Sequence, residues 1–275
     1  MNDDAPFVSG RTRMFAILGH PIEQVGSPAM FSAEFIRRKA PALLIPLHVL
    51  PDDFDATMRQ LLKLGNLDGL VFTIPYKQRA LAFADHVGAQ GEAAGGINGL
   101  ARRADGWHGD MFDGLGCVEA FRRQGISLAG KRLQLIGAGG AGSAIGVAMA
   151  FEAPRSIRVT DVDPQRAEQL VERISCVAPS VEVTTGPARL DDIDVLLNAS
   201  PVGMLTDARM PIDVSAIDPR VIVFDAIVVP EPTPMIAKAK ERGCRVLVGR
   251  EMMRGQMARI VDFFGYPEKA GDSAR

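Results

Sequence analysis

Residues Leu135–Gly142 read LIGAGGAG, a glycine-rich turn that follows one apolar segment and precedes another. The pattern predicts a β-strand before the turn and an α-helix after it. Gly137 permits a tight turn, Gly139 lets the backbone come close to a ligand, and Gly142 lets the helix pack closely against the strand. The free N–H groups and the positive dipole at the start of the helix favour a phosphate. The turn therefore predicts a pyrophosphate site.

A second predicted strand, Ser156–Thr160, ends directly before Asp161. A carboxylate at this position can accept hydrogen bonds from both ribose hydroxyls of a dinucleotide. Because the strand, the turn, the helix and the acidic residue occur in this order, the sequence predicts dinucleotide binding. The alternative is a tight strand–helix turn that binds no ligand.

The segment after this strand also favours NAD over NADP. The 2′-phosphate of NADP requires Arg or Lys just after the second strand. Asp161 and Asp163 place two carboxylates there, which disfavours NADP by about 1–3 kcal/mol. Asp163 is also expected to cap a helix that begins at Pro164. Arg158 and Arg166 leave NADP as the less favoured alternative.

The composition argues against several classes of protein. The net charge is −2 and the chain has no run of basic residues, so a nucleic-acid partner is not expected. Met1–Arg13 carries acidic residues and lacks the apolar segment of a secretory signal. The 3 cysteines are widely spaced, and neither they nor the 4 histidines show the spacing of metal ligands. We therefore expect a cytoplasmic protein with reduced thiols, no metal and no membrane partner.

Strand-like and helix-like segments alternate along the chain, which favours an α/β fold with parallel sheets. At 275 residues the chain is long enough for two domains. A hairpin is expected at Arg103–Gly106. The helix at Gly114–Arg123 is expected to lead into the dinucleotide-binding half, and a last helix, Met252–Phe264, to fold back on the first half.

The first half contains polar residues that a nucleotide site does not explain. Thr73 and Lys77 follow an apolar strand, and the carboxyl ends of strands are where open α/β sheets build their sites. Asn98 follows the small residues Ala93–Gly96, which allow a ligand to come close. Asp110 ends the short segment after Trp107. Taken singly, each is more often structural, because a lone Lys is usually solvated and a lone Asp is usually a cap.

In combination, these motifs resemble the shikimate dehydrogenase family over residues 14–265. The motifs that carry the resemblance, in chain order, are Ile17–Ile22 with Ser27-Pro28, Thr73–Lys77, Gly95–Asn98, Gly109-Asp110, Gly137–Ala141, Asn198–Met204, Thr233-Pro234, and Gly249 with Met252-Met253 and Gln256.

The resemblance implies an N-terminal α/β substrate domain, residues 1–113 with 249–275. It implies a Rossmann-type doubly wound NAD(P)-binding domain over residues 114–248. It also implies that Lys77 and Asp110 form the catalytic pair. A Lys ammonium group stabilises the alkoxide that develops when a secondary alcohol loses a hydride, and the carboxylate orients the lysine and helps to carry the proton.

Further roles are carried over by the same resemblance. Ser27 is expected to contact the substrate carboxylate, while Thr73, Asn98 and Gln256 are expected to hydrogen-bond to ring hydroxyls. The residues expected to border the cofactor are Gly137, Ala138, Gly139, Gly140, Ala141, Asp161, Ser200, Val202, Met204, Ala226 and Gly249.

Some positions depart from the family pattern. Val25, Val71 and Val228 stand where the family has hydrogen-bonding side chains, and the Asn-Arg-Thr phosphate clamp of the family is replaced by residues 161–163. His108-Gly109, beside the expected catalytic acid, replaces the usual Asn-Thr. These changes predict weaker contacts to a substrate carboxylate and hydroxyls.

We therefore expect reversible NAD-linked oxidation of a hydroxylated cyclohexane or cyclohexene carboxylate, shikimate or quinate, by a monomer or homodimer. NADP is the less favoured cofactor. One alternative is a related dehydrogenase that acts on a less polar cyclic alcohol. Another is a catalytically idle NAD-binding sensor, although such a protein has no need of both Lys77 and Asp110.

Overall fold

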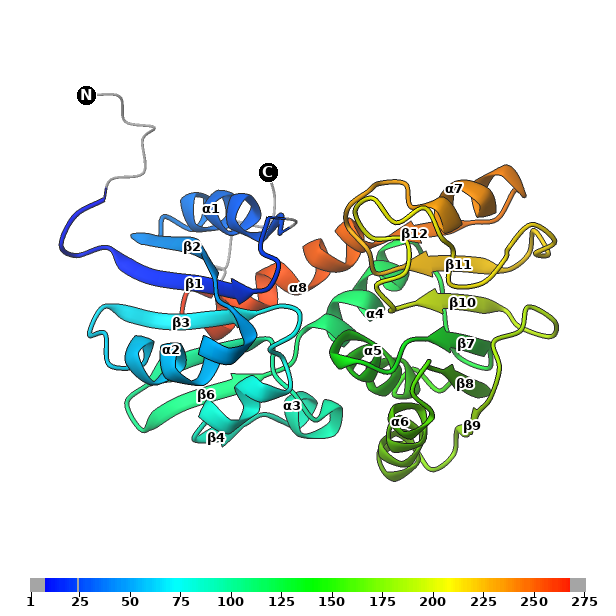
Figure 1. Ribbon diagram of the computed structural model, residues 1–275, viewed down its shortest axis with the longest axis horizontal. Helices are drawn as coiled ribbons and strands as arrows, with labels where there is room; N and C mark the ends of the chain where they lie inside the picture. Colours follow the sequence, from blue (N-terminus) through cyan, green and yellow to red (C-terminus); the bar gives the residue numbers. More distant parts are fainter. Residues whose placement is uncertain (1–7, 24, 268–275) are drawn as a thin grey trace. The chain divides into compact units, whose positions relative to one another are not determined.

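The computed structural model describes residues 8–23 and 25–267, which divide into two compact units (Figure 1). The N-terminal unit comprises the described residues up to Glu92, Gly96–Phe112, and the described residues from Met257 on. The central unit comprises Ala93–Gly95 and Asp113–Gln256. Each unit is built around its own sheet.

The sheet of the N-terminal unit has the strand order β2-β1-β3-β5-β6-β4. Its strands are β1 (Arg13–Gly19), β2 (Ala42–His48), β3 (Leu67–Phe72), β4 (His86–Val87), β5 (Gly99–Arg103) and β6 (Gly106–Asp110). Strand β1 runs parallel to β2 and β3, whereas β5 is antiparallel to both β3 and β6. The sheet is therefore mixed rather than wholly parallel. The pairing of Arg103 with Gly106 confirms the expected hairpin, which reverses the chain between β5 and β6.

Both faces of this sheet are covered by apolar side chains. Along β1, Phe15 and Ile17 belong to one buried cluster, while Ala16 and Leu18 belong to another, as the two-residue period of a strand requires. The helices of the unit are α1 (Ser27–Arg37), α2 (Phe54–Leu61) and α3 (Ala89–Ala94), with short 3₁₀ segments at Pro51–Asp53 and Arg79–Phe83. The continuous apolar run in β1 thus marks a strand buried on both sides.

The sheet of the central unit is parallel throughout, with the order β12-β11-β10-β7-β8-β9. Its strands are β7 (Arg132–Ile136), β8 (Ser156–Thr160), β9 (Glu182–Thr185), β10 (Val195–Asn198), β11 (Ile222–Asp225) and β12 (Val246–Val248). The helices are α4 (Asp113–Arg123), α5 (Gly140–Ala150), α6 (Pro164–Val177), α7 (Pro234–Glu241) and α8 (Gly249–Phe263), the last of which continues into the N-terminal unit. This strand order, which reverses direction between β7 and β10, is that of a doubly wound dinucleotide-binding fold.

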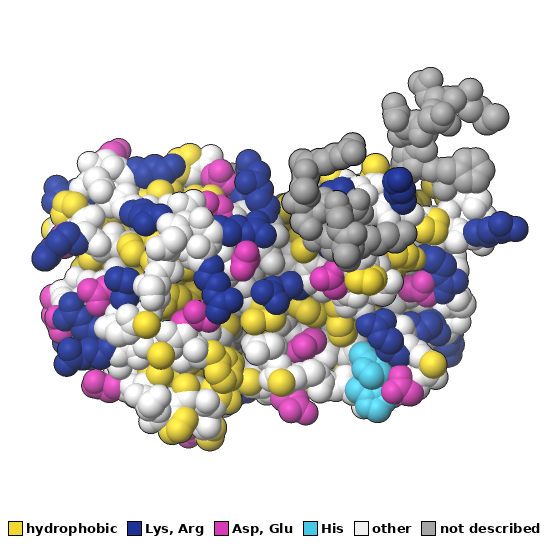
Figure 2. Space-filling view, turned by 180° about the vertical axis from the view of Figure 1, so that it is seen from behind, with side chains coloured by type: hydrophobic (Ala, Val, Ile, Leu, Met, Phe, Trp, Pro, Cys, Tyr) yellow, Lys and Arg dark blue, Asp and Glu magenta, His cyan; other side chains and the backbone are white. Residues whose placement is uncertain are grey.

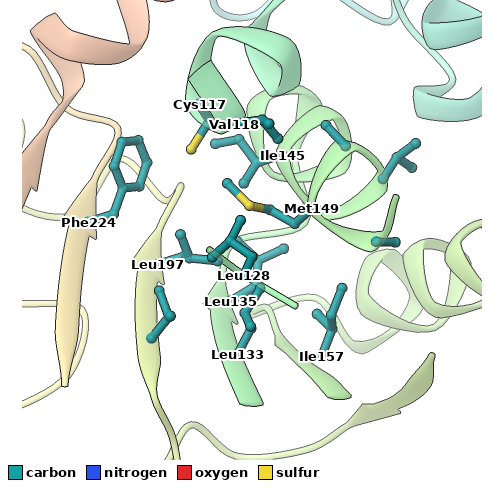
Figure 3. Packing of buried hydrophobic residues seen from close by; sticks show 14 of the residues in the cluster. Cys117, Val118, Leu128, Leu133, Leu135, Ile145, Met149, Ile157, Leu197 and Phe224 are labelled. Atoms are coloured by element: carbon teal, nitrogen blue, oxygen red, sulfur yellow. The ribbon is translucent and has the colours of Figure 1, made fainter. Parts of the chain in front are cut away.

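Buried side chains from helices and strands meet in the core of the central unit (Figure 3). Leu135 of β7 and Leu197 of β10 lie beneath Ile145 and Met149 of α5, and all are at most 1% exposed. Small residues bring α4 and α5 together, since a Cβ added at Gly114 would lie 2.1 Å from the carbonyl oxygen of Ala144. Helix α5 is therefore held close to both its strand and its neighbouring helix.

The first half of α8 packs within the central unit. A Cβ at Gly116 would lie 2.5 Å from the carbonyl oxygen of Met252, and one at Gly255 would lie 2.5 Å from that of Gly116. This glycine contact joins α4 to α8 and places Gly249–Gln256 with the central unit. The change of unit thus occurs inside α8, between Gln256 and Met257. The predicted domain bounds, 1–113 with 249–275 and 114–248, remain predictions. Among the residues described, no helix is long and apolar enough to span a membrane.

Candidate active site

Four of the predicted residues lie at one edge of the N-terminal sheet. Parallel strands β1 and β3 both end at this edge, and antiparallel β5 begins there opposite the end of β6, with Gly99 paired to Asp110. The residues that flank these strand ends include Thr73, Lys77, Asn98 and Asp110. The topology thus brings together polar groups that lie far apart in the sequence.

The backbone around Lys77 is fixed on both sides. Tyr76 is fully buried, stacks on Phe54 with ring centroids 4.2 Å apart, and donates its hydroxyl hydrogen to the carbonyl of Val49. The carbonyl of Lys77 accepts a hydrogen bond of 2.8 Å from the N–H of Ile97. The half-buried lysine therefore extends from a rigid turn, which favours a defined position for its ammonium group.

Asn98 joins the end of β3 to the segment that follows β6. It is 2% exposed, and its carbonyl accepts the N–H of Phe72 at 2.9 Å. Its own N–H donates to the carbonyl of Asp110 at 3.0 Å, and its Oδ1 accepts the N–H of Phe112 at 2.9 Å. Asn98 therefore holds the backbone of residues 110–112 in place, in addition to the substrate contact predicted for it.

The carboxylate of Asp110 is engaged with the backbone. Its Oδ1 accepts N–H groups from Gly91 at 2.7 Å and Met111 at 2.8 Å. Gly88 packs so closely that a Cβ there would lie 2.3 Å from the Asp110 Oδ2. Asp110 thus connects α3 to β6, and its predicted catalytic role requires it to act while holding these contacts.

Sequence reasoning passed over a second carboxylate, that of Asp113. It is the first residue of α4 and is only 2% exposed, and an ionisable group is rarely buried so completely unless it has partners. The signal was the sequence Asp113-Gly114-Leu115-Gly116, because two glycines in a helix cost helical stability and so indicate close packing.

Two further predicted substrate residues lie on helices. Ser27 is the first residue of α1, directly after the N-cap Gly26, and is half-buried. Gln256 lies in α8 and is half-buried, with its Cβ packed against Gly116 of α4. Their predicted roles remain predictions.

The glycine-rich turn of the central unit has the form that a pyrophosphate requires. Gly137 has a φ of +98°, and its N–H donates to the carbonyl of Thr160 at 2.8 Å. A Cβ at Gly139 would meet nothing within 4 Å, so open space lies beside the first turn of α5. Within residues 8–23 and 25–267, no side chain caps this helix at Gly139, an arrangement that suits an anionic ligand at its first N–H groups. These residues fit the diphosphate of a dinucleotide, with Gly140 and Ala141 forming the start of the helix.

Asp161 lies beside this turn, at the end of β8. Its Oδ2 accepts the N–H of Ala138 at 2.6 Å and its Oδ1 accepts the N–H of Asp163 at 2.9 Å. Val162 is fully exposed. Asp163 caps α6 by accepting the N–H of Gln165 at 3.0 Å, which confirms its predicted capping role.

The loop after β10 is held by a buried polar network. Asn198 donates from Nδ2 to Oδ1 of Asp225 at 3.1 Å, and its Oδ1 accepts both the N–H and the hydroxyl of Ser200 at 3.0 and 2.7 Å. Thr233, the N-cap of α7, donates its hydroxyl to Oδ2 of Asp225 at 2.7 Å. The network thus positions the segment that contains Val202 and Met204 at the same edge of the sheet as the glycine-rich turn.

Ala226 and Gly249 meet at this edge as well. The N–H of Ala226 donates to the carbonyl of Asn198 at 2.9 Å, and a Cβ at Gly249 would lie 2.4 Å from the carbonyl oxygen of Ala226. The structure therefore gathers the predicted cofactor residues of the central unit at the carboxyl ends of β7, β8, β10 and β11.

Comparison with known proteins identifies the family. A family model described as the shikimate dehydrogenase substrate binding domain matches residues 17–100. A curated relative, the shikimate dehydrogenase (NADP(+)) of Rubrobacter xylanophilus, is 31% identical over 253 residues, covering 90% of this chain and 89% of the relative. The chain belongs to the shikimate dehydrogenase family.

Solved structures share the whole fold of this family member. The shikimate 5-dehydrogenase of Listeria monocytogenes, in complex with shikimate and NAD, has a TM-score of 0.84 at 23% identity, with 95% of this chain and 94% of that chain covered. The quinate dehydrogenase of Corynebacterium glutamicum, in complex with NAD, has a TM-score of 0.81 at 24% identity, with 92% and 93% covered. At these identities the similarity shows the fold.

Burial shifts the pKa of Asp225, a member of the polar network that holds the loop after β10. Removal from water raises the pKa of Asp225 to about 6, against the opposing effect of hydrogen bonds from Ile227, Thr233 and Asn198. A carboxyl group whose pKa is higher in the folded than in the unfolded chain favours folding while it is protonated. Its contribution to stability is therefore lost as the pH rises from about 4 to about 6.

We expect the variant Asp225→Asn to gain stability relative to the wild type as the pH rises from 4.5 to 7, because the neutral amide does not ionise in the buried site. The measurement is urea unfolding of both proteins across this range. The matched control is Asp218→Asn, since the Arg220 side chain lowers the pKa of that exposed carboxyl to about 2. For this control, the difference from the wild type in free energy of unfolding should not change with pH above pH 5. A difference for Asp225→Asn that is equally independent of pH would contradict the prediction.

Proposed function

We propose that this protein catalyses reversible NAD(P)-linked hydride transfer between a 3-dehydro ketone and a hydroxylated cyclohexane or cyclohexene carboxylate, shikimate or quinate. The observation that carries the proposal is the rigidly held Lys77 at the polar edge of one sheet, on a chain whose second sheet carries an uncapped, glycine-rich dinucleotide turn. The relatives named above are shikimate and quinate dehydrogenases, which supports this substrate class.

In the proposed reaction, side chains of the protein stabilise the reacting oxygen and move its proton. A bound nicotinamide dinucleotide accepts the hydride in one direction and donates it in the other. Lys77 hydrogen-bonds to the reacting oxygen and stabilises the negative charge that develops on it. A carboxylate beside the lysine orients the ammonium group and helps to move the hydroxyl proton to water.

Two carboxylates compete for the role beside Lys77. Asp110 is the residue expected from the sequence, but its Oδ1 already accepts two backbone N–H groups. Asp113 is buried, and its backbone follows directly after the segment that Asn98 holds. We propose Asp113 as the stronger candidate, because its carboxylate is buried at the start of α4, whereas that of Asp110 is already engaged by the backbone.

We expect Lys77→Ala to lower kcat by about 10²–10⁴-fold, because the variant lacks the donor that stabilises the developing alkoxide. The affinity for NADH should change little, since the lysine belongs to a different unit from the glycine-rich turn. Steady-state kinetics and a fluorescence titration with NADH measure the two quantities. Retention of a substantial part of the wild-type turnover would show that Lys77 is a surface residue.

The variants Asp110→Asn and Asp113→Asn form a matched pair for the carboxylate, since each keeps the shape and removes the charge. Asp113→Asn should reduce kcat strongly with little change in Tm, whereas Asp110→Asn should mainly lower Tm by weakening its contacts with Gly91 and Met111. The reverse result would return the catalytic role to Asp110.

We further propose that the enzyme prefers NAD, although the name of the Rubrobacter relative specifies NADP. The support comes from the segment after β8, where the exposed Val162 is flanked by two aspartates. The side chain of Arg166, which could attract a 2′-phosphate, lies with Nε 3.3 Å from Oδ2 of Asp163. A phosphate dianion at this position would face both carboxylates.

The variant Val162→Arg should narrow or invert the ratio of kcat/KM with NAD to that with NADP, because it adds a phosphate ligand without disturbing Asp161. Asp161→Ala in combination with Val162→Arg should shift the ratio further. Val162→Leu serves as the control and should leave the ratio unchanged. A wild-type enzyme that prefers NADP would overturn the proposal.

A second candidate function is oxidation of a less polar cyclic alcohol. Val71 is 5% exposed in the cluster that contains Phe15, and Val25 packs against the same cluster, so hydrogen-bonding groups of the family pattern are replaced by core packing. An unpaired substrate oxygen costs about 1–3 kcal/mol, which corresponds to a loss of affinity of roughly 5- to 140-fold.

The assay that tests the proposed function is formation of reduced cofactor when shikimate or quinate is added to the purified protein. We expect turnover with a high KM, and Val25→Ser should lower KM more than it changes kcat, because it adds a contact made in both the ground and the transition state. Turnover only with a less polar cyclic alcohol would favour the second candidate. Binding of NADH with no turnover of any such alcohol would indicate a sensor.

The proposal also covers the localisation, oligomeric state and partners of the enzyme. We propose a cytoplasmic monomer or homodimer whose partner is a small hydroaromatic acid, with neither nucleic acid nor membrane as a partner. The three free cysteines and the net charge of −2 support this assignment.

A further inference from the structure

Two histidines and an aspartate meet at the far edge of the N-terminal sheet. His86 and His108 occupy paired positions on parallel strands β4 and β6, and Asp105 lies in the turn that closes the β5–β6 hairpin. One ligand atom from each residue lies within 4.8 Å of the others. A histidine patch with an acidic side chain beside it is visible on the molecular surface in Figure 2.

The distances between these atoms suit a transition metal ion. Bonds of about 2.0–2.2 Å to zinc place the ligand atoms of a tetrahedral site roughly 3.3 Å apart. Nε2 of His108 lies 2.9 Å from Oδ1 of Asp105, and Nε2 of His86 lies 3.7 Å from Oδ2 of the same residue. One separation is shorter and the other longer than the required one, and they end on different oxygens of Asp105, so side-chain rotations bring one atom of each residue onto one ion.

The backbone that carries these ligands is rigid. The N–H of Trp107 donates to Oδ2 of Asp85 at 2.8 Å, and the N–H of Asp85 donates to the carbonyl of Trp107 at 2.8 Å. Gly106 packs against Asp85, where a Cβ would lie 2.6 Å from that oxygen. The end of the hairpin is therefore fixed to the residue that precedes His86, and a fixed backbone reduces the entropy lost when a ligand binds.

The chemistry of the donors selects the class of ion. Two imidazole nitrogens and one carboxylate favour zinc and its neighbours nickel and copper over magnesium and calcium, which prefer oxygen ligands. The carboxylate of Asp105 supplies the one oxygen ligand beside the two imidazole nitrogens. The side chains are 50%, 65% and 31% exposed for His86, Asp105 and His108, which leaves room for water as a fourth ligand.

We propose that His86, Asp105 and His108 bind one divalent ion of the zinc class at the surface of the N-terminal unit. The ion ties edge strand β4 to the β5–β6 hairpin. Strand β4 leads into Gly88, whose N–H donates to the carbonyl of Gly109, and then into α3, which contacts Asp110. The site is thus separate from the predicted substrate residues but stabilises the strand ends that carry Asp110.

The test is a calorimetric titration of the full-length protein with zinc chloride at pH 7.5. We expect one ion bound per chain at this site, and a Tm that rises by several degrees in excess zinc, because an ion that binds the folded chain stabilises it. His86→Ala and His108→Ala should each weaken binding at least tenfold and abolish the rise in Tm. Binding should also weaken at pH 5.5, since a histidine must be unprotonated to bind a metal.

The matched control is His48→Ala, which alters the other histidine pair, His20 and His48, whose Nδ1 and Nε2 atoms lie 2.9 Å apart. This variant should keep the affinity for zinc and the rise in Tm. Circular dichroism confirms that each variant is folded. Unchanged zinc affinity in His86→Ala and His108→Ala, or an equal loss in His48→Ala, would overturn the proposal.

Discussion

The contact between Gly142 and the carbonyl of Gly137 is the constraint on which the nucleotide half of the molecule depends. A single Cβ at Gly142 would lie 1.9 Å from that carbonyl oxygen, so no other residue type fits. The contact brings the N-terminus of α5 directly to the end of β7, where its N–H groups can serve a ligand. Gly137 in turn approaches the backbone of Ala199 and Ser200 closely, since a Cβ added at Gly137 would lie 2.7 Å from the backbone nitrogen of Ser200. Turn, helix and neighbouring loop therefore form one fixed edge.

The N-terminal half reaches an equivalent rigidity by different means. The sheet edge near Lys77 is held by the side chain and backbone of Asn98, which connect β3 to the segment after β6. The stack of Tyr76 on Phe54 adds an aromatic anchor beside Lys77. In one half, then, small residues allow close approach, and in the other a buried amide and a buried ring hold the chain.

Patterns among neighbouring residues were sufficient to predict the features that depend only on those residues. The turn at Gly137, the cap at Asp163 and the hairpin at Arg103–Gly106 all follow from the conformational preferences of a few adjacent residues. Features that depend on the register between distant strands were not accessible in this way. The pairing of His86 with His108 is an example, because nothing in the spacing of the two residues indicates that β4 lies beside β6.

Asp110 and Asp113 show a second kind of feature that the sequence alone does not predict. Both are aspartates near the end of a strand, and the sequence alone does not distinguish a carboxylate that holds two backbone N–H groups from one that is buried at a helix start. The packing of the first half of α8 was not predicted for a similar reason, since Gly116 of α4, which it contacts, lies far earlier in the chain.

The contacts of Asp161 shape how cofactor choice can change during evolution. Its carboxylate accepts the N–H of Ala138, so replacing it removes a hydrogen bond that braces the glycine-rich turn. Val162 is fully exposed and makes no comparable contribution to folding. Substitutions at position 162 therefore carry little risk to the fold, whereas those at position 161 need a compensating change. One exposed valine between two aspartates that brace the backbone is thus the position of this segment at which neutral drift is freest.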